Sequence, residues 1–238
     1  MARRQPTSTP PLKVAVAGHF QVGKSTLVNC LLRKRAARCG DTTKATTART
    51  KPYRLGHLTL FDTPGINAEE DHDKEMAKGL QQADLVLLVM SSQKALTEPL
   101  ARLAAGIART RIPLYMVINC WDDRNWSDGD PETVGRKEVV KTIQCQIGEK
   151  ATPVGTVIVN LEWAAAARGC LKDETRVGKL LREYGQGSED AARTLEQRSR
   201  LSQLEDFLFP HPQSALSPAG LECAALTSKF LRRLKTHR

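Results

Sequence analysis

The sequence lacks any long apolar run. Its longest candidate, Leu85–Met90 (LVLLVM), has the length of a buried strand, whereas a membrane-spanning helix needs roughly 20 apolar residues. The N-terminal stretch MARRQPTSTPPLK also lacks the apolar core of a signal peptide, and we expect residues 1–11 to form a disordered leader. These absences favour a cytoplasmic protein and leave peripheral attachment at the inner membrane surface as an open alternative.

Paired cysteines are also missing. The chain has six cysteines, with no C-x-x-C pair and no histidine at zinc spacing. We therefore expect small buried or half-buried thiols in a reducing cytosol, and no metal or disulfide framework. The cysteines are Cys30, Cys39, Cys120, Cys145, Cys170 and Cys223.

The formal net charge of +10 is unevenly distributed, and acidic residues are scarce in two segments. Residues 33–54 hold eight basic residues and one acid, and residues 229–238 hold five basic residues and no acid. Such patches attract nucleotide phosphates, RNA or an anionic lipid surface. A plain solvated surface is the alternative.

Short apolar runs alternate with helix-like segments. The runs are apolar on both faces, which favours an α/β fold with a mostly parallel central sheet and helices on both faces. Ligands of such sheets bind beyond the carboxyl ends of the strands, where every polar motif described below falls. We predict a loop over Arg38–Tyr53, and strands at Leu12–Ala17, Leu58–Phe61, Leu85–Met90, Ile112–Ile118 and Thr156–Val159.

The octapeptide GHFQVGKS fits the phosphate-binding pattern G-x-x-x-x-G-K-[ST]. Its glycines let successive main-chain N–H groups point at phosphates. In this pattern the lysine, here Lys24, contacts the β- and γ-phosphates. The hydroxyl of the next residue, Ser25, ligates a Mg²⁺ ion. The predicted nucleotide-binding residues of this loop are Gly18, Gln21, Val22, Gly23, Lys24, Ser25 and Thr26.

A second polar motif, Asp-Thr-Pro-Gly, begins at Asp62 directly after a predicted strand. Asp62 can hold Mg²⁺ through water, as the corresponding aspartate does in phosphate-loop enzymes. The Gly65 N–H is placed to meet a γ-phosphate. An ordinary turn after a strand is the alternative, since Thr-Pro-Gly favours turns.

These residues resemble the translation-factor-like and Ras-like GTPase superfamily, and within it the Era-like and dynamin-like bacterial branch. The resemblance covers roughly Leu12–Phe209. It implies a three-layer P-loop NTPase fold, binding of GTP or GDP with Mg²⁺, and hydrolysis of GTP. It also implies a threonine in the first switch that binds Mg²⁺ and closes over the γ-phosphate. Judged by sequence distance from the phosphate loop and from the Asp-Thr-Pro-Gly motif, Thr47 is the first candidate for this threonine and Thr46 is the second.

The base-recognition motif of that family, N-K-x-D, corresponds to Asn119-Cys120-Trp121-Asp122. The Asp122 carboxylate would accept hydrogen bonds from guanine that adenine cannot donate, and Asn119 would tie the neighbouring loops together. Cys120 replaces the lysine that packs over the base. The last base loop resembles S-A-x but has Asn160 and Leu161, where a backbone N–H would meet the guanine oxygen.

The segment SRLSQLEDFLF (Ser199–Phe209) resembles the closing helix of these domains. It follows the last base loop at an unusually long distance, so we expect a GTPase domain over 12–209 with a helical insertion at about 163–198. Residues 210–238 are expected to form a linker and a basic amphipathic C-terminal helix. That helix suits a membrane surface or packs on the domain.

The sequence does not identify the group that orients the water molecule that attacks GTP. Ras-like proteins place a glutamine after the second-switch glycine, where this chain has Ile66. Some relatives with a hydrophobic residue there recruit K⁺ through a phosphate-loop asparagine, and Gln21 is the matching residue. We predict a slow GTPase switch, stimulated by a partner, a cation or nucleotide-dependent homodimerisation. The alternatives are a nucleotide-dependent module that docks on RNA, the ribosome or a membrane, and an ATPase.

Overall fold

The computed structural model describes residues 11–39, 50–65, 79–92, 98–120, 153–185 and 187–209. Strands in these ranges form one six-stranded sheet. Its strands are β1 (Leu12–Gly18), β2 (Lys51–Leu55), β3 (Leu58–Asp62), β4 (Leu85–Ser91), β5 (Leu114–Asn119) and β6 (Gly155–Val159).

The strand order is β2-β3-β1-β4-β5-β6. β1 pairs in parallel with β3 on one side and β4 on the other. β4 pairs in parallel with β5, and β5 with β6, whereas β2 is antiparallel to β3. The predicted mostly parallel sheet is therefore confirmed.

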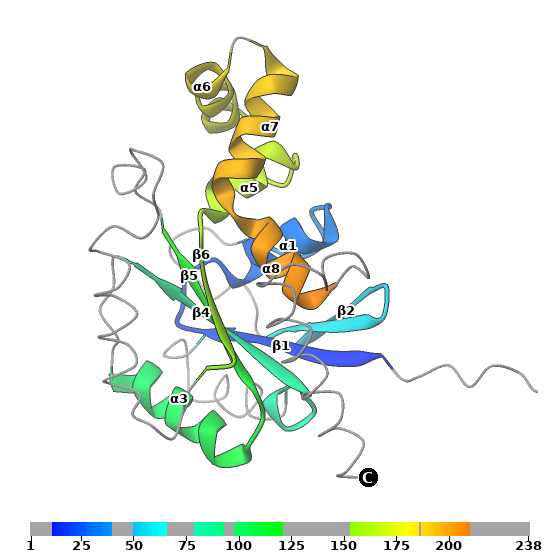
Figure 1. Cartoon of the computed structure of the whole chain (residues 1–238), viewed down its shortest axis with the longest axis vertical. Coiled ribbons are helices and arrows are strands. Elements are labelled where there is room, and N and C mark those ends of the chain that lie inside the picture. Colours follow the sequence, from blue (N-terminus) through cyan, green and yellow to red (C-terminus); the bar gives the residue numbers. More distant parts are fainter. Residues whose placement is uncertain are drawn as a thin grey trace, which may run out of the picture.

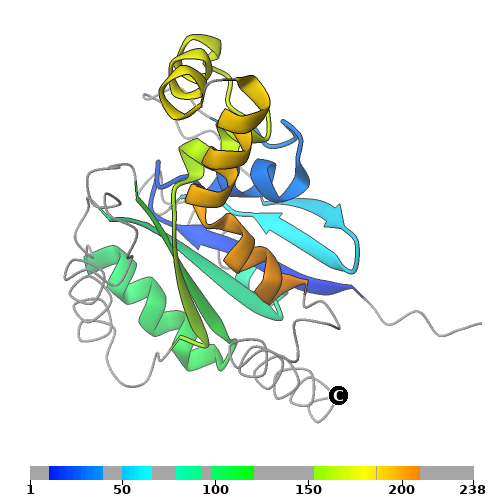
Figure 2. The same cartoon turned by 45° about the horizontal axis from the view of Figure 1, so that its top comes forward.

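Helices cover both faces of this sheet. On one face α1 (Lys24–Leu32), α5 (Leu161–Ala167) and α8 (Leu201–Leu208) share a core with alternate strand residues such as Leu60 and Leu87. On the other face α3 (Glu98–Thr110) places Ile107 against the core that holds Leu88 and Met116. Figures 1 and 2 show the sheet between these helices. The three-layer α/β architecture is confirmed, because strands that are apolar on both faces need cover on both.

Two further helices, α6 (Glu174–Tyr184) and α7 (Ser188–Ser199), follow α5. They lie beyond the end of the sheet, at the top of Figure 1. A small separate core of Trp163, Leu180 and Leu195 holds them to α5. The segment in which we expected an insertion is thus helical, and its first helix already begins at Leu161.

The predicted loop over Arg38–Tyr53 is wrong at its end, since β2 begins at Lys51. β2 forms a hairpin with β3 in which Leu55 pairs with Leu58, across a turn where Gly56 has a φ of 57°. Only Tyr53 and Leu55 of this edge strand are partly buried. The alternation of apolar and polar residues in β2 is therefore too short for the sequence to distinguish this strand from a loop.

The thiols of the described residues behave as expected. Cys30, Cys120 and Cys170 are buried, and Cys39 is half-buried. Burial raises the pKa of the Cys30 thiol well above its usual range. No helix in the described ranges is both long and apolar enough to cross a bilayer.

Candidate nucleotide-binding site

Four of the predicted motif positions meet at one edge of the sheet. The carboxyl ends of β1, β3 and β5 bring Gly18, Asp62 and Asn119 there, and Asn160 follows β6 directly. The parallel register places Asp62 opposite Val16 of β1. This is the arrangement that the order of strands and motifs predicted, because parallel strands end at a common edge.

The phosphate loop runs from the end of β1 to the start of α1. Gly18 must be glycine, because with its φ of 150° a Cβ would lie 2.2 Å from the Val89 carbonyl oxygen. Gln21 and Gly23 have φ values of 62° and 102°, and alternation with the left-handed region turns main-chain N–H groups inward. The N-cap residue of α1, Gly23, has no side chain that could cap the helix, and the first turn of α1 has no acidic residue. The loop therefore has the chemistry of an anion site.

Lys24 is buried at the base of this loop, with 7% of its surface exposed. Its Nζ donates to the His19 carbonyl at 2.8 Å, across the loop. Burial lowers the pKa of Lys24 to about 8, while the negative charge of Asp62 acts in the opposite direction. The ammonium is thus held in place at a site where a phosphate would favour its charged form.

Ser25 and Asp62 bring two oxygen ligands together. The Ser25 hydroxyl donates to Asp62 Oδ2 at 2.9 Å, and Asp62 is 1% exposed. A hydroxyl and a carboxylate are the donors that Mg²⁺ prefers, so the side chains present fit that ion. The hydrogen bond brings together residues that are 37 positions apart in the chain.

The turn after β3 lies against the phosphate loop. The Thr63 hydroxyl donates to the Val16 carbonyl at 2.8 Å, which fixes the turn to β1. Gly65 is buried, and a Cβ there would lie 2.8 Å from Phe20 Cα and 3.1 Å from Lys24 Nζ. Only glycine allows this close approach, so the Gly65 backbone lies beside the groups that are predicted to hold the γ-phosphate.

Asn119 is fully buried and joins three segments. Its Nδ2 donates to the Val22 carbonyl of the phosphate loop at 3.0 Å, and its Oδ1 accepts from the Leu161 N–H at 3.1 Å. A Cβ on Gly23 would lie 2.9 Å from both Asn119 Nδ2 and Leu161 Cδ1. The structure therefore brings the two base-recognition segments onto the phosphate loop.

The last base loop differs in detail from the expectation. Because the Leu161 N–H already donates to Asn119, it is committed within the protein. Asn160 caps α5, with its Oδ1 accepting from the Trp163 N–H at 3.0 Å. Its own N–H donates to the Ser199 carbonyl at 3.0 Å. The loop is thus held by side-chain and main-chain contacts that the sequence did not reveal.

Some predicted residues lie outside the described ranges: Thr47 with its alternative Thr46, Ile66 and Asp122. Cys120, which stands in place of the family's lysine, is described. It is 5% exposed, and its N–H donates to the Val159 carbonyl at 2.8 Å. A short buried thiol cannot cover a base as a lysine stem does. Thr26 is half-buried near Cys39, with 3.7 Å between Oγ1 and Sγ.

Sequence reasoning missed two positions. The His19 carbonyl anchors Lys24, and main-chain partners leave no signal in side-chain patterns. Ser199 contacts the base loop from 39 positions away. Only the resemblance of its segment to a closing helix hinted that the segment returns to the sheet.

Comparison with known proteins agrees with this geometry. The family described as 50S ribosome-binding GTPase matches residues 13–120. The GTPase Der of Nitratiruptor sp. is 31% identical over 121 residues, which cover 47% of this chain and 26% of Der. The GTPase Der of Halorhodospira halophila is 34% identical over 122 residues, with the same coverage. The matches thus span about a quarter of the length of these relatives.

Among solved structures, the chain resembles Era in complex with MgGDPNP and a fragment of 16S ribosomal RNA. The TM-score is 0.50 at 20% identity, over 64% of this chain and 52% of the Era chain. At this identity the likeness concerns the fold, and it agrees with the sheet and helices described above. Residues 13–120 are therefore similar to a P-loop GTPase domain, in sequence to the 50S ribosome-binding GTPase family and to the GTPase Der, and in fold to Era.

Proposed function

We propose that the chain binds GTP with Mg²⁺, hydrolyses it to GDP and phosphate, and acts as a slow molecular switch. The observation that carries the proposal is the meeting of Lys24, Ser25 and Asp62 at the phosphate loop, with Asn119 linking that loop to the base-recognition segments. Phosphoryl transfer to water depends on positioning and charge stabilisation, which such a site supplies.

The chain's own residues would bind the phosphates and the metal ion. Main-chain N–H groups from Gln21 to Thr26 surround the phosphates, and Lys24 holds the β- and γ-phosphates. Ser25 and Asp62 would hold Mg²⁺, with Thr47 as a third ligand. The ion, when bound, neutralises charge on the phosphate oxygens.

Loss of the γ-phosphate is the event that the switch would report. Gly65 lies against the phosphate loop beside Lys24, so an N–H at this position would contact a γ-phosphate and lose that contact after hydrolysis. Thr47 would be released at the same time. Two loop conformations then follow from one chemical change.

Guanine selection would rest on the carboxylate of Asp122. Its two oxygens accept hydrogen bonds from the ring N–H and exocyclic amine of guanine, and adenine offers neither. Asn119 would hold this loop in register with the phosphate loop through Val22. A true ATPase would bind ATP in competition with GDP, and this comparison separates the two nucleotide classes.

Ile66 cannot orient the attacking water, so we infer an intrinsic rate at or below about 10⁻² s⁻¹. Potassium is an open candidate for stimulation, because Gln21 is exposed on the phosphate loop. Nucleotide-dependent homodimerisation is another. Single-turnover hydrolysis in K⁺ against Na⁺, over a range of protein concentrations, tests both. Fast turnover by the monomer in Na⁺ would refute the slow-switch proposal.

A second candidate is a nucleotide-dependent module that docks on RNA, the ribosome or an anionic membrane. Exposed Arg33, Lys34, Arg35 and Arg38 support it, as does the binding of RNA by the Era relative. The domain would span 12–209 with an insertion near 163–198, in the cytoplasm, and residues 210–238 would add the basic helix. Salt-sensitive binding to RNA or anionic vesicles, lost on removing residues 221–238, would favour this candidate.

A further inference from the structure

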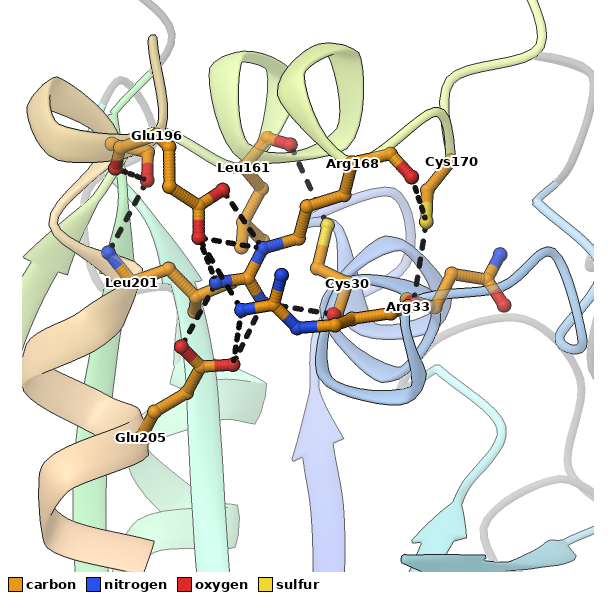
Figure 3. Close-up of polar contacts among 10 residues, drawn as sticks. Cys30, Arg33, Leu161, Arg168, Cys170, Glu196, Leu201 and Glu205 are labelled. Carbon is orange, nitrogen blue, oxygen red and sulfur yellow. Dashed lines mark hydrogen bonds and ion pairs between the residues drawn. The ribbon is translucent and has the colours of Figure 1, made fainter. Parts of the chain in front are cut away.

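The buried guanidinium of Arg168 joins three helices. Arg168 follows the last residue of α5, and 2% of its side chain is exposed. Its Nε donates to Glu196 Oε2 of α7 at 2.9 Å, and its two terminal nitrogens donate to the oxygens of Glu205 of α8 at 2.8 and 2.9 Å. A second bond from the guanidinium reaches Glu196 Oε1. Figure 3 shows the guanidinium between the two carboxylates.

The third helix is α1, which begins with Lys24 and Ser25. Arg168 donates to the Cys30 carbonyl in the last turn of α1 at 2.9 Å. Arg33 is the C-cap residue of α1. Its Nη2 lies 3.7 Å from Glu196 Oε1 and 3.8 Å from Glu205 Oε1, but its side chain is 63% exposed. Because α1 has nine residues, it is about 13 Å long. A displacement at Cys30 would therefore be carried to the phosphate-binding end.

The turn after Arg168 also holds the segment that follows α1. Arg35 donates to the carbonyls of Gly169 at 3.1 Å and Leu171 at 2.5 Å. The Lys172 ammonium donates to the Cys39 carbonyl at 3.3 Å. Residues 33–39 lead directly into the segment that contains Thr47. The same turn thus holds Arg35 and Cys39, which precede the predicted first switch in the sequence.

The two acidic partners of Arg168 lie on either side of the contact with the base loop. Ser199, whose carbonyl accepts from the Asn160 N–H, is three positions after Glu196, and its hydroxyl donates to the Glu196 carbonyl. Arg200 then has a φ of 58° and separates α7 from α8. Holding Glu196 and Glu205 therefore also holds the Ser199 carbonyl against the base loop.

We propose that Arg168 is a positioning residue for the nucleotide, which clamps α7 and α8 to the end of α1 and thereby slows nucleotide release. The proposal rests on the proposed function, since it needs a bound guanine nucleotide. Arg168 touches neither Lys24 nor Asn119 in the described contacts. It acts through the helix that carries Lys24 and the loop that Asn119 holds.

The test compares dissociation of a fluorescent GDP from the full-length chain and its variants. Arg168→Lys keeps the positive charge but loses the planar fork that reaches two carboxylates and a carbonyl. We expect GDP release to become about five- to tenfold faster, which lies within the roughly two- to thirtyfold range of such indirect couplings. Glu205→Gln removes one charged partner and keeps its shape, and should speed release in the same direction by less.

Arg176→Met is the matched control. Arg176 donates to both oxygens of Glu162 at 2.7 and 2.8 Å, so it forms the same type of ion pair within the α5–α6 pair. This ion pair joins α6 to α5, whereas the contacts of Arg168 reach α1, α7 and α8. We expect a lower thermal midpoint in this variant with unchanged GDP release. Circular dichroism of each variant checks that it is folded.

The outcomes separate the two proposals. Faster release in Arg168→Lys and Glu205→Gln, with Arg176→Met unchanged, supports the positioning role. Unchanged release in both test variants, or equal acceleration in all three, refutes it. If Arg168→Lys does not fold, Glu205→Gln decides. A wild-type chain that binds no guanine nucleotide would refute the proposed function itself.

Discussion

Replacing Lys24 by methionine should stabilise the nucleotide-free chain at neutral pH and lose this advantage in alkali. Burial lowers the pKa of Lys24 from 10.5 to about 8, and Asp62 acts against that shift. In the unfolded chain the ammonium keeps its ordinary pKa. Below pH 8 both states are therefore charged, and folding must bury a cation at a cost of about 3 kcal/mol.

The pH window follows from these two pKa values. Between pH 8 and pH 10.5 the unfolded state binds more protons than the folded state, so the stability of the wild type rises with pH. Above pH 10.5 both states are neutral and the cost is gone. Methionine carries no charge at any pH, but it loses the bond to His19, worth about 1 kcal/mol. The variant should thus be more stable by about 2 kcal/mol near neutral pH, with the gain disappearing in alkali.

Urea denaturation of both proteins at several pH values measures this difference. Lys34→Met is the control, because Lys34 is exposed and its removal reports the general effect of losing a surface lysine. The difference between Lys24→Met and wild type should shrink as the pH rises above 8, and that for Lys34→Met should stay flat. A constant difference for Lys24→Met would refute the argument that burial lowers the Lys24 pKa.

Three further predictions concern the nucleotide. Phosphates favour the protonated form of Lys24, so GDP affinity should fall about tenfold per pH unit above pH 8; a titration with equal affinity across that range would contradict this. Gly23→Ala should destabilise the chain by about 2–4 kcal/mol and weaken GDP binding, because the new Cβ would contact Asn119 and the backbone there is strained for alanine. Urea denaturation measures the stability, and a GDP titration measures the affinity. A variant with unchanged stability and affinity would refute this prediction. Asp122→Asn should weaken guanine binding and admit xanthine nucleotide; competition that still strongly favours guanine would exclude Asp122 as the base reader.

The sheet and the phosphate side of the site could be predicted from the sequence because their signals are local. The apolar runs that became β1, β4 and β5 are buried on both faces and stand out from their surroundings. The phosphate loop and the turn after β3 are short motifs whose glycines are required by close approaches. Parallel order then brings Ser25 to Asp62.

The rest depends on contacts between distant segments. β2 is an edge strand with little apolar alternation, so its pairing with β3 decided its structure. Arg168 and Glu196 look like ordinary solvated charges in the sequence, and the guanidinium is buried by contacts with α1, α7 and α8 that join distant parts of the chain. The commitment of the Leu161 N–H to Asn119 likewise depends on geometry between β5 and β6.

The most direct measurement is retention of GTP and GDP by the purified chain with and without Mg²⁺, compared with Lys24→Ala. The phosphate loop and the Ser25–Asp62 pair predict tight, magnesium-dependent retention by the wild type and a large loss in the variant. A chain that retains neither nucleotide, or whose retention is the same without magnesium and without the Lys24 ammonium, would contradict the account.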